Sequence, residues 1–91
     1  MKVKIGKYEY EKSSRKDKKL MTMVDGKRVH FGNPKYKHWK DKTGIWKSMD
    51  HNDKERRKNY LTRSAGIKDK DGKLTKDNPS SPNYHARKIL W

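Results

Sequence analysis

Cysteine is absent from this chain of 91 residues, so neither disulfide bridges nor thiolate metal sites can stabilise it. Hydrophobic residues are also scarce, at 29% of the sequence, which leaves only a thin core for one small domain. Domains with so little apolar material usually need a disulfide, a metal or a partner. The sequence therefore predicts that another macromolecule contributes to its stability.

Long hydrophobic runs are missing as well. No apolar run approaches the roughly 18 residues of a membrane-spanning helix. Residues 1–7 intersperse lysine with apolar residues, so they lack the apolar stretch of a signal peptide. We therefore expect a soluble protein that is made without secretion and has no membrane partner.

Positive charge and aromatic rings are what the chain has in excess. It carries 26 Lys and Arg against 11 Asp and Glu, a net charge of +15, and interleaves these cations with three Trp, five Tyr and one Phe. A disordered tail would be depleted in aromatics, because low hydrophobicity with high net charge cannot offset the entropy cost of ordering. The combination predicts a folded protein that lies against an acidic surface.

The first third of the chain has the alternation of half-buried β-strands. Val3 and Ile5 alternate with lysines, and Tyr8 and Tyr10 alternate with charged residues. The basic segment 12–19 follows, and we predict a flexible loop there. A phosphate-contacting loop and a solvated arm are the alternatives.

A hairpin is the strongest local prediction. Residues 20–24 and 28–31 flank the pair Asp25-Gly26. This pair suits a type I′ turn, because both central positions of that turn need a positive φ.

Residues 33–49 mix aromatic and basic side chains without a regular period, after a turn favoured by Asn33-Pro34. Such a mixture can stack bases while it neutralises phosphates, as single-strand-binding surfaces do. The simpler interpretation is that these rings cover the hairpin.

Residues 50–66 are predicted to form a helix, with Asp50 as its N-cap and Gly66 as a left-handed residue at its C-terminal end. Acidic residues in its first turns and basic residues in its later turns complement the helix dipole. Only Tyr60, Leu61 and Ala65 can face a core. Most of this helix must therefore be solvated or pressed against an acidic partner.

The last quarter of the chain is predicted as a loop and a short helix. Residues 67–80 hold a turn at Asp71-Gly72, and their acidic residues do not match the spacing of a calcium loop. Ser81-Pro82 is typical of an N-cap and first helical turn, so residues 81–91 form the helix. Trp91 then predicts a plug that fills a pocket in this domain or in a neighbour.

These segments predict a single α+β domain over residues 1–91. It has a small sheet centred on a β-hairpin, one basic helix and a short C-terminal helix. Its parts are a β-rich segment, an aromatic and basic loop, a helix, a second loop and a terminal helix, over residues 1–32, 33–49, 50–66, 67–80 and 81–91.

Catalytic and metal-binding motifs are not found. The four histidines have no compact metal-ligand spacing, and neither a phosphate-binding glycine loop nor a nucleophile elbow is present. His51 and Asp53 resemble a nuclease acid and base, but both also suit the first turn of a helix. We therefore expect a non-enzymatic protein with no catalytic residue, metal, cofactor or small-molecule substrate.

Short fragments in a fixed order give residues 20–91 a recognisable pattern. They are Val29-His30-Phe31-Gly32, Tyr36, His51-Asn52-Asp53, Arg56-Arg57, Tyr60-Leu61, Arg63, Tyr84, Arg87 and Leu90-Trp91. Each is weak alone, but together they resemble the small basic proteins that tailed bacteriophages and large DNA viruses encode. The chain departs from that pattern at His85 and Lys88, where aromatic residues are more usual.

The resemblance implies a viral origin, and the charge then suggests a virion structural protein. In that role the chain is a capsid-associated auxiliary or minor head protein, made in the host cytoplasm and located in the virion. Its expected partners are viral capsid proteins and packaged DNA, both of which offer acidic surfaces. The alternative is a free nucleic-acid-binding protein. Its binding would be non-specific, because lysine predominates over arginine and lacks the forked guanidinium group that contacts guanine bidentately.

Two sets of contact residues are predicted for either role. The partner-binding anchors are the large aromatics Trp39, Trp46, Tyr84 and Trp91. The electrostatic contacts are Arg15, Lys16, Lys18, Lys19, Arg56, Arg57, Arg63 and Arg87.

Overall fold

The structure is a computed structural model that describes residues 2–91. It is an α+β arrangement, as predicted, with one four-stranded antiparallel sheet in the order β1-β2-β3-β4. The strands are β1 (Val3–Ile5), β2 (Tyr8–Lys12), β3 (Leu20–Val24) and β4 (Lys27–Phe31). The helices are the 3₁₀ turn η1 (Lys47–Met49), α1 (Lys54–Ala65), the 3₁₀ turn η2 (Thr75–Asp77) and α2 (Pro82–Ile89).

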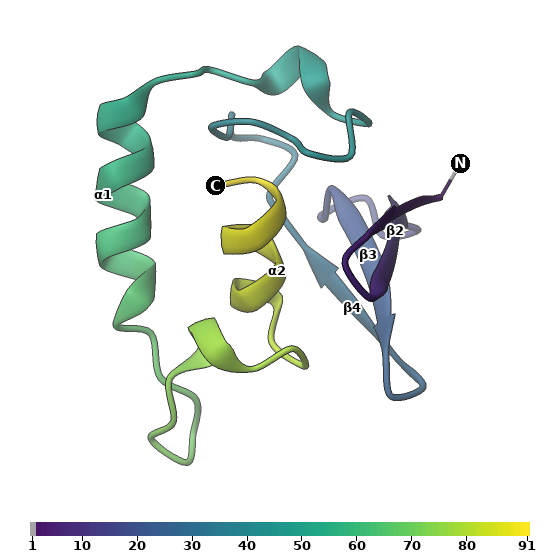
Figure 1. Cartoon of the computed structure of the whole chain (residues 1–91), viewed down its shortest axis with the longest axis vertical. Coiled ribbons are helices and arrows are strands. Elements are labelled where there is room, and N and C mark those ends of the chain that lie inside the picture. The colour runs from purple at the N-terminus through teal and green to yellow at the C-terminus, as the bar shows by residue number, and fades with distance from the viewer. Residues whose placement is uncertain (1) are drawn as a thin grey trace.

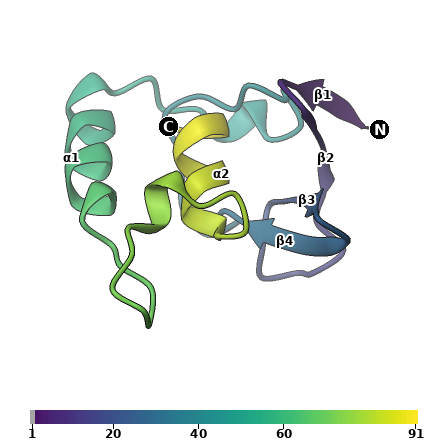
Figure 2. The ribbon, with the colours of Figure 1, turned by 60° about the horizontal axis from the view of Figure 1, so that its bottom comes forward.

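The helix α2 is the centre of the molecule, since it lies between the sheet and α1 (Figures 1 and 2). The buried core joins side chains of the sheet to those of α2 and the residue after it: Tyr10, Leu20, Phe31, Ala86, Ile89 and Leu90. Full burial of one large apolar side chain contributes about 1.5–3 kcal/mol. The chain thus builds a core of its own from the N-terminal sheet and the C-terminal helix.

The hairpin prediction is confirmed. Asp25 and Gly26 have φ of 50° and 80°, which are the positive values that the turn between β3 and β4 needs. The register pairs Leu20 with Phe31 and Thr22 with Val29. Because side chains alternate along a strand, this register places Leu20 and Phe31 together in the core with α2, while Met23 is exposed on the other face.

The helix α1 starts later than predicted. Its N-cap is Asp53, whose carboxylate accepts hydrogen bonds from the backbone N–H groups of Glu55 at 3.0 Å and Arg56 at 3.3 Å. Asp50 is therefore not the cap. Gly66 follows the helix with φ of −92°, so the predicted left-handed end is also wrong.

The turn in the loop and the start of the terminal helix agree with the predictions, but α2 ends at Ile89 instead of residue 91, and the loop also holds the 3₁₀ turn η2. Residues 69–73 form a turn in which the Asp69 carboxylate accepts from the backbone N–H groups of Asp71 and Lys73. Ser81 caps α2, because its hydroxyl accepts from the backbone N–H of Asn83 at 3.3 Å, and Pro82 is the first helical residue.

Candidate functional site

A groove of about 670 Å³ opens where the loop after β4, the helix α1 and the end of the chain meet. Its volume lies within the range of about 300–1,000 Å³ that is usual for ligand sites. We call it the basic groove. Its lining residues are Lys18, Lys19, Phe31, Gly32, Asn33, Tyr36, Lys37, His38, His51, Arg56, Asn59, Tyr60, Arg63, Pro82, Asn83, Ala86, Leu90 and Trp91.

The charge of the basic groove has one sign. Lys and Arg side chains line it, and no Asp or Glu does. Within residues 2–91, Lys18, Lys37 and Arg63 form no ion pair, whereas Arg56 lies 3.8 Å from the Asp53 carboxylate. The groove therefore offers several unneutralised cations to an anionic ligand.

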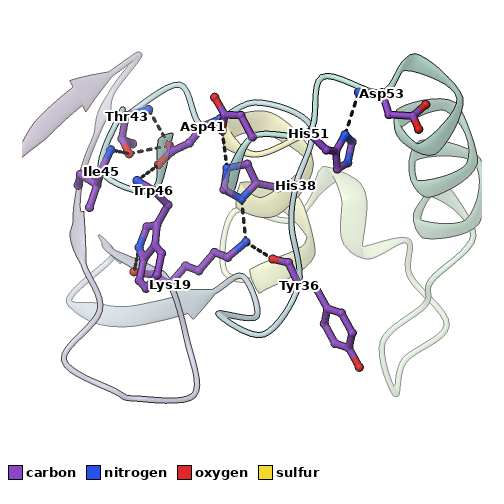
Figure 3. Close-up of polar contacts among 10 residues, drawn as sticks. Lys19, Tyr36, His38, Asp41, Thr43, Ile45, Trp46, His51 and Asp53 are labelled. Carbon is purple, nitrogen blue, oxygen red and sulfur yellow. Dashed lines mark hydrogen bonds and ion pairs between the residues drawn. The ribbon is translucent and has the colours of Figure 1, made fainter. Parts of the chain in front are cut away.

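A buried lysine supports the groove from below. Lys19 is only 2% exposed, and its Nζ donates to the carbonyl oxygen of Tyr36 at 2.6 Å and to Nδ1 of His38 at 2.7 Å (Figure 3). Burial lowers the pKa of Lys19 to about 8, partly opposed by the carboxylates of Asp41 and Asp50. At neutral pH the side chain is thus still largely an ammonium group.

The charge of Lys19 fixes the tautomer of His38. An ammonium group can only donate, so Nδ1 of His38 accepts. The proton of the neutral ring is then on Nε2, which donates to the Asp50 carboxylate at 2.6 Å. Burial, and then the charge of Lys19, lower the pKa of His38 and keep the ring neutral.

Asp41 organises the next stretch of the loop. Its carboxylate accepts from the backbone N–H and hydroxyl of Thr43 at 2.8 and 2.6 Å and from the backbone N–H of Trp46 at 2.7 Å. The indole of Trp46 in turn donates to the carbonyl oxygen of Lys19 at 2.8 Å. Apart from η1 at its end, the loop of residues 33–49 is thus held by a buried polar network.

Tyr36 lies at the end of a turn in this loop. Its backbone N–H donates to the carbonyl oxygen of Asn33 at 3.1 Å, which confirms the turn predicted from Asn33-Pro34. The ammonium group of Lys19 donates to the carbonyl oxygen of Tyr36. The side chain of Tyr36 is 68% exposed and points away from the buried network (Figure 3). The backbone of Tyr36 is therefore fixed and its ring is free.

The lining of the groove also includes a pair of stacked rings. Trp91 stacks on Tyr60 of α1, with ring centroids 4.2 Å apart and an angle of 10° between the planes. His51 lies beside Trp91 at a centroid distance of 5.2 Å. Nε2 of His51 is the one buried side-chain polar atom of residues 2–91 that has no hydrogen-bond partner.

His51 and Asp53 do not form an acid and base pair. Nδ1 of His51 accepts from the backbone N–H of Asp53 at 2.9 Å, and the Asp53 carboxylate caps α1. Burial, and then the charge of Arg56, lower the pKa of His51. Both residues thus order the chain at the start of the helix.

All four predicted aromatic anchors make contacts within the chain. Trp46 packs against the core, Trp39 lies under the guanidinium of Arg57 at 4.1 Å, and the ring of Tyr84 meets His85 edge to face. Trp91 stacks on Tyr60. All four are half-buried, and of these anchors only Trp91 lines the basic groove.

The predicted electrostatic residues divide into three groups. Lys19 is buried and is not a surface cation, and internal contacts also hold Arg57, which donates to the carbonyl oxygen of Trp91, and Arg87, which donates to Ser64. Exposed side chains away from the groove are Arg15, which pairs with Asp17, and Lys16. The basic groove brings together Lys18, Arg56 and Arg63.

Most groove residues were not among the predicted contacts, and of these Tyr36 and Lys37 supply an exposed ring and an exposed cation. The sequence analysis included both residues in the aromatic and basic segment 33–49, where base stacking was the less favoured interpretation, and it singled out Tyr36 only as a fragment of the viral resemblance. The signal that could have found it is the turn at Asn33-Pro34, because the fourth residue of an exposed turn often keeps its side chain in solvent.

Neither a metal site nor a membrane span is found in the part of the chain that the structure describes. No group of three His, Asp or Glu side chains there is placed to hold a metal ion, and no helix is long and apolar enough to cross a bilayer.

No family model, curated protein or solved structure matches this chain. Function must therefore be argued from its own residues.

Proposed function

We propose that this chain is a non-enzymatic structural protein of a viral particle. It acts as a capsid-associated auxiliary or minor head protein, and its basic surface attaches to acidic surfaces of the shell or to packaged DNA. It is made in the host cytoplasm and enters the virion during assembly. The viral assignment comes from the sequence resemblance, and the mode of attachment comes from the charge.

The observation that carries this proposal is how few cations are neutralised within the chain. The sequence has 26 Lys and Arg, but the ion pairs within residues 2–91 that involve them are only those of Lys2, Arg15, Arg56 and Lys76. Such an excess favours association with an acidic partner.

Attachment of this kind depends on many weak contacts. One exposed ion pair contributes at most about 1 kcal/mol, so no single lysine can hold the protein on a particle. Several faces carry exposed lysines, among them Lys4, Lys16, Lys27 and Lys58. A multivalent, salt-sensitive attachment follows from this arrangement.

The test is to look for the protein in purified particles. Nuclease-treated virions, analysed by quantitative mass spectrometry, are expected to contain it in a fixed ratio to the major capsid protein, and washes of rising NaCl concentration are expected to release it. Retention in particles emptied of DNA identifies the shell as the partner, and loss with the DNA identifies DNA. Absence from intact virions contradicts the proposal.

A second candidate, a free nucleic-acid-binding protein, is favoured by the basic groove. If the protein makes roughly eight phosphate contacts, log K should fall with log salt at a slope of about −7 on duplex DNA. The two candidates are separated by location, because a free binding protein stays in the infected-cell lysate and is missing from washed particles.

A further inference from the structure

The basic groove combines two features that a surface of lysines alone does not have. One is a hollow whose lining has several Lys and Arg side chains and no Asp or Glu side chain. The other is a set of aromatic rings in the same lining, namely Tyr36 and the stacked pair of Tyr60 and Trp91. A ligand that fits must therefore be both anionic and able to contact flat rings.

The ring of Tyr36 is placed as a stacking platform. Its backbone is held on both sides, by the turn hydrogen bond to Asn33 and by the ammonium group of Lys19. Its side chain is nevertheless 68% exposed, more than any other large apolar side chain in residues 2–91. A fixed backbone lowers the entropy cost of using this ring to hold a ligand.

The cations of the groove come from three separate segments. Lys18 precedes β3, Lys37 follows Tyr36, and Arg56 and Arg63 lie two turns apart on α1. This spread suits the repeated charges of a chain-like ligand better than the single charge of a small metabolite. Arg63 also has a guanidinium plane, which can stack on a base as well as contact a phosphate.

We propose that the basic groove binds a single strand of nucleic acid, with an unpaired base stacked on Tyr36 and the adjoining phosphates on Lys37 and Arg63. An acidic peptide would satisfy the cations but would leave the exposed ring without a flat partner. A duplex keeps its bases paired and cannot place one on Tyr36. The inference concerns the ligand that the groove recognises. It applies both to a protein bound in a particle and to a free protein.

The test measures binding of a fluorescein-labelled oligothymidylate, roughly 12 nucleotides long and so within the usual range of single-strand sites, by fluorescence anisotropy. Tyr36→Ala is expected to weaken binding by about 5- to 150-fold, the loss typical of one stacked base. Tyr36→Phe keeps the ring and is expected to bind like the unmodified chain. Circular dichroism and thermal melting establish that each variant is folded.

Charge-matched variants separate the groove from the rest of the basic surface. The pair Lys37→Gln with Arg63→Gln removes two groove cations. The pair Lys4→Gln with Arg28→Gln removes two exposed cations that line a second pocket, formed by residues of the sheet, and that do not line the basic groove. The groove pair is expected to lower affinity and to reduce the steepness of the log K against log salt plot by about 1.4, at about 0.7 for each phosphate contact. The sheet pair is expected to change both much less.

Three results would overturn the inference. The first is Tyr36→Ala binding as tightly as the unmodified chain, and the second is equal losses in the groove pair and the sheet pair. The third is displacement of the oligothymidylate by oligoglutamate at equal charge concentration, which would assign the groove to acidic peptides. Because all of these use the purified protein, they are independent of whether virions contain it.

Discussion

Lys19 shows how one residue organises the floor of the basic groove. Its backbone N–H donates to the carbonyl oxygens of Phe31 and Gly32 at 3.1 and 3.0 Å, and its own carbonyl oxygen accepts from Ser13. Its side chain then reaches the loop at Tyr36 and His38. A buried charge is tolerated only when it is paired and hydrogen-bonded, and here the neutral ring of His38 links it to the carboxylate of Asp50.

His85 makes the stability of the fold depend on pH. It is fully buried, its Nδ1 accepts from the hydroxyl of Tyr10 at 2.8 Å, and its Nε2 donates to the carbonyl oxygen of Pro79 at 2.6 Å. Because the Pro79 carbonyl can only accept, the proton of the neutral ring is on Nε2, and Nδ1 is left as the acceptor for Tyr10. Burial, aided by the charge of Lys88, lowers the pKa of His85 below its usual value of 6.5.

The lowered pKa of His85 predicts how the stability of the fold depends on pH. Below pH 6.5 the unfolded chain takes up a proton that folded His85 does not, so the free energy of unfolding should fall as pH falls toward the folded pKa. The contribution of one such group is about 1.4 kcal/mol for each pH unit in that window. Urea unfolding from pH 7.5 downwards measures it, and His85→Gln is expected to reduce the slope without abolishing it, because His38 contributes in the same direction.

The control for this prediction is His30→Gln. His30 lies half-buried on the edge strand β4, where its ring is hydrogen-bonded to Ser13, so its contribution to the slope should be smaller. Equal slopes in the unmodified chain and in His85→Gln would contradict the argument.

The predictions for secondary structure succeeded where a local motif was sufficient. Asp25-Gly26 fixes a turn through its own backbone preference, and Ser81-Pro82 fixes a helix start in the same way. Asp50 failed as a predicted cap because a tertiary contact claims it: its carboxylate accepts from His38 and from the backbone of Asp41. Asp53 caps the helix instead. The local sequence could not show that Asp50 is used in this tertiary contact.

The turn that joins β4 to the groove depends on Gly32. It has φ of 80°, and a Cβ there would lie 2.9 Å from Cδ1 of Leu90 and 3.0 Å from Cβ of Lys19. Gly44 is a matched control, since it has φ of 77° and open space around an added Cβ.

Replacing each of these glycines by alanine separates backbone strain from packing. Both variants incur the cost of a left-handed alanine, about 1–2 kcal/mol, but Gly32→Ala must also displace core side chains, at about 1–3 kcal/mol more. Chemical unfolding should therefore show Gly32→Ala to be the less stable of the two by that difference. Equal stabilities would mean that Leu90 and Lys19 move aside without cost.

The basic groove could be predicted only in part, because its walls come together from segments far apart in the chain. The positive charge of Lys18, Arg56 and Arg63 was evident, and so was the mixture of rings and cations in residues 33–49. Nothing in the basic segment from Arg15 to Lys19 distinguishes the buried Lys19 from the exposed Arg15 and Lys16. Only the pairing of Leu20 with Phe31 places Lys19 beneath the loop.

The molecule as a whole carries a net charge of +15, and few ion pairs form within residues 2–91. Repulsion between its cations therefore destabilises the folded state. Salt should screen that repulsion more than it weakens exposed pairs.

We therefore expect the melting temperature to rise with NaCl in differential scanning fluorimetry, by about 4–8 °C for each kcal/mol gained in a domain of this size. Exchanging the exposed residues Lys16 and Lys58 for glutamate lowers the net charge from +15 to +11, because each exchange removes one positive and adds one negative charge. This variant should melt higher at low salt and gain less from NaCl. A melting temperature that falls with NaCl in the unmodified chain would mean that attractive pairs outweigh repulsion, and would remove the reason for this chain to need an acidic partner.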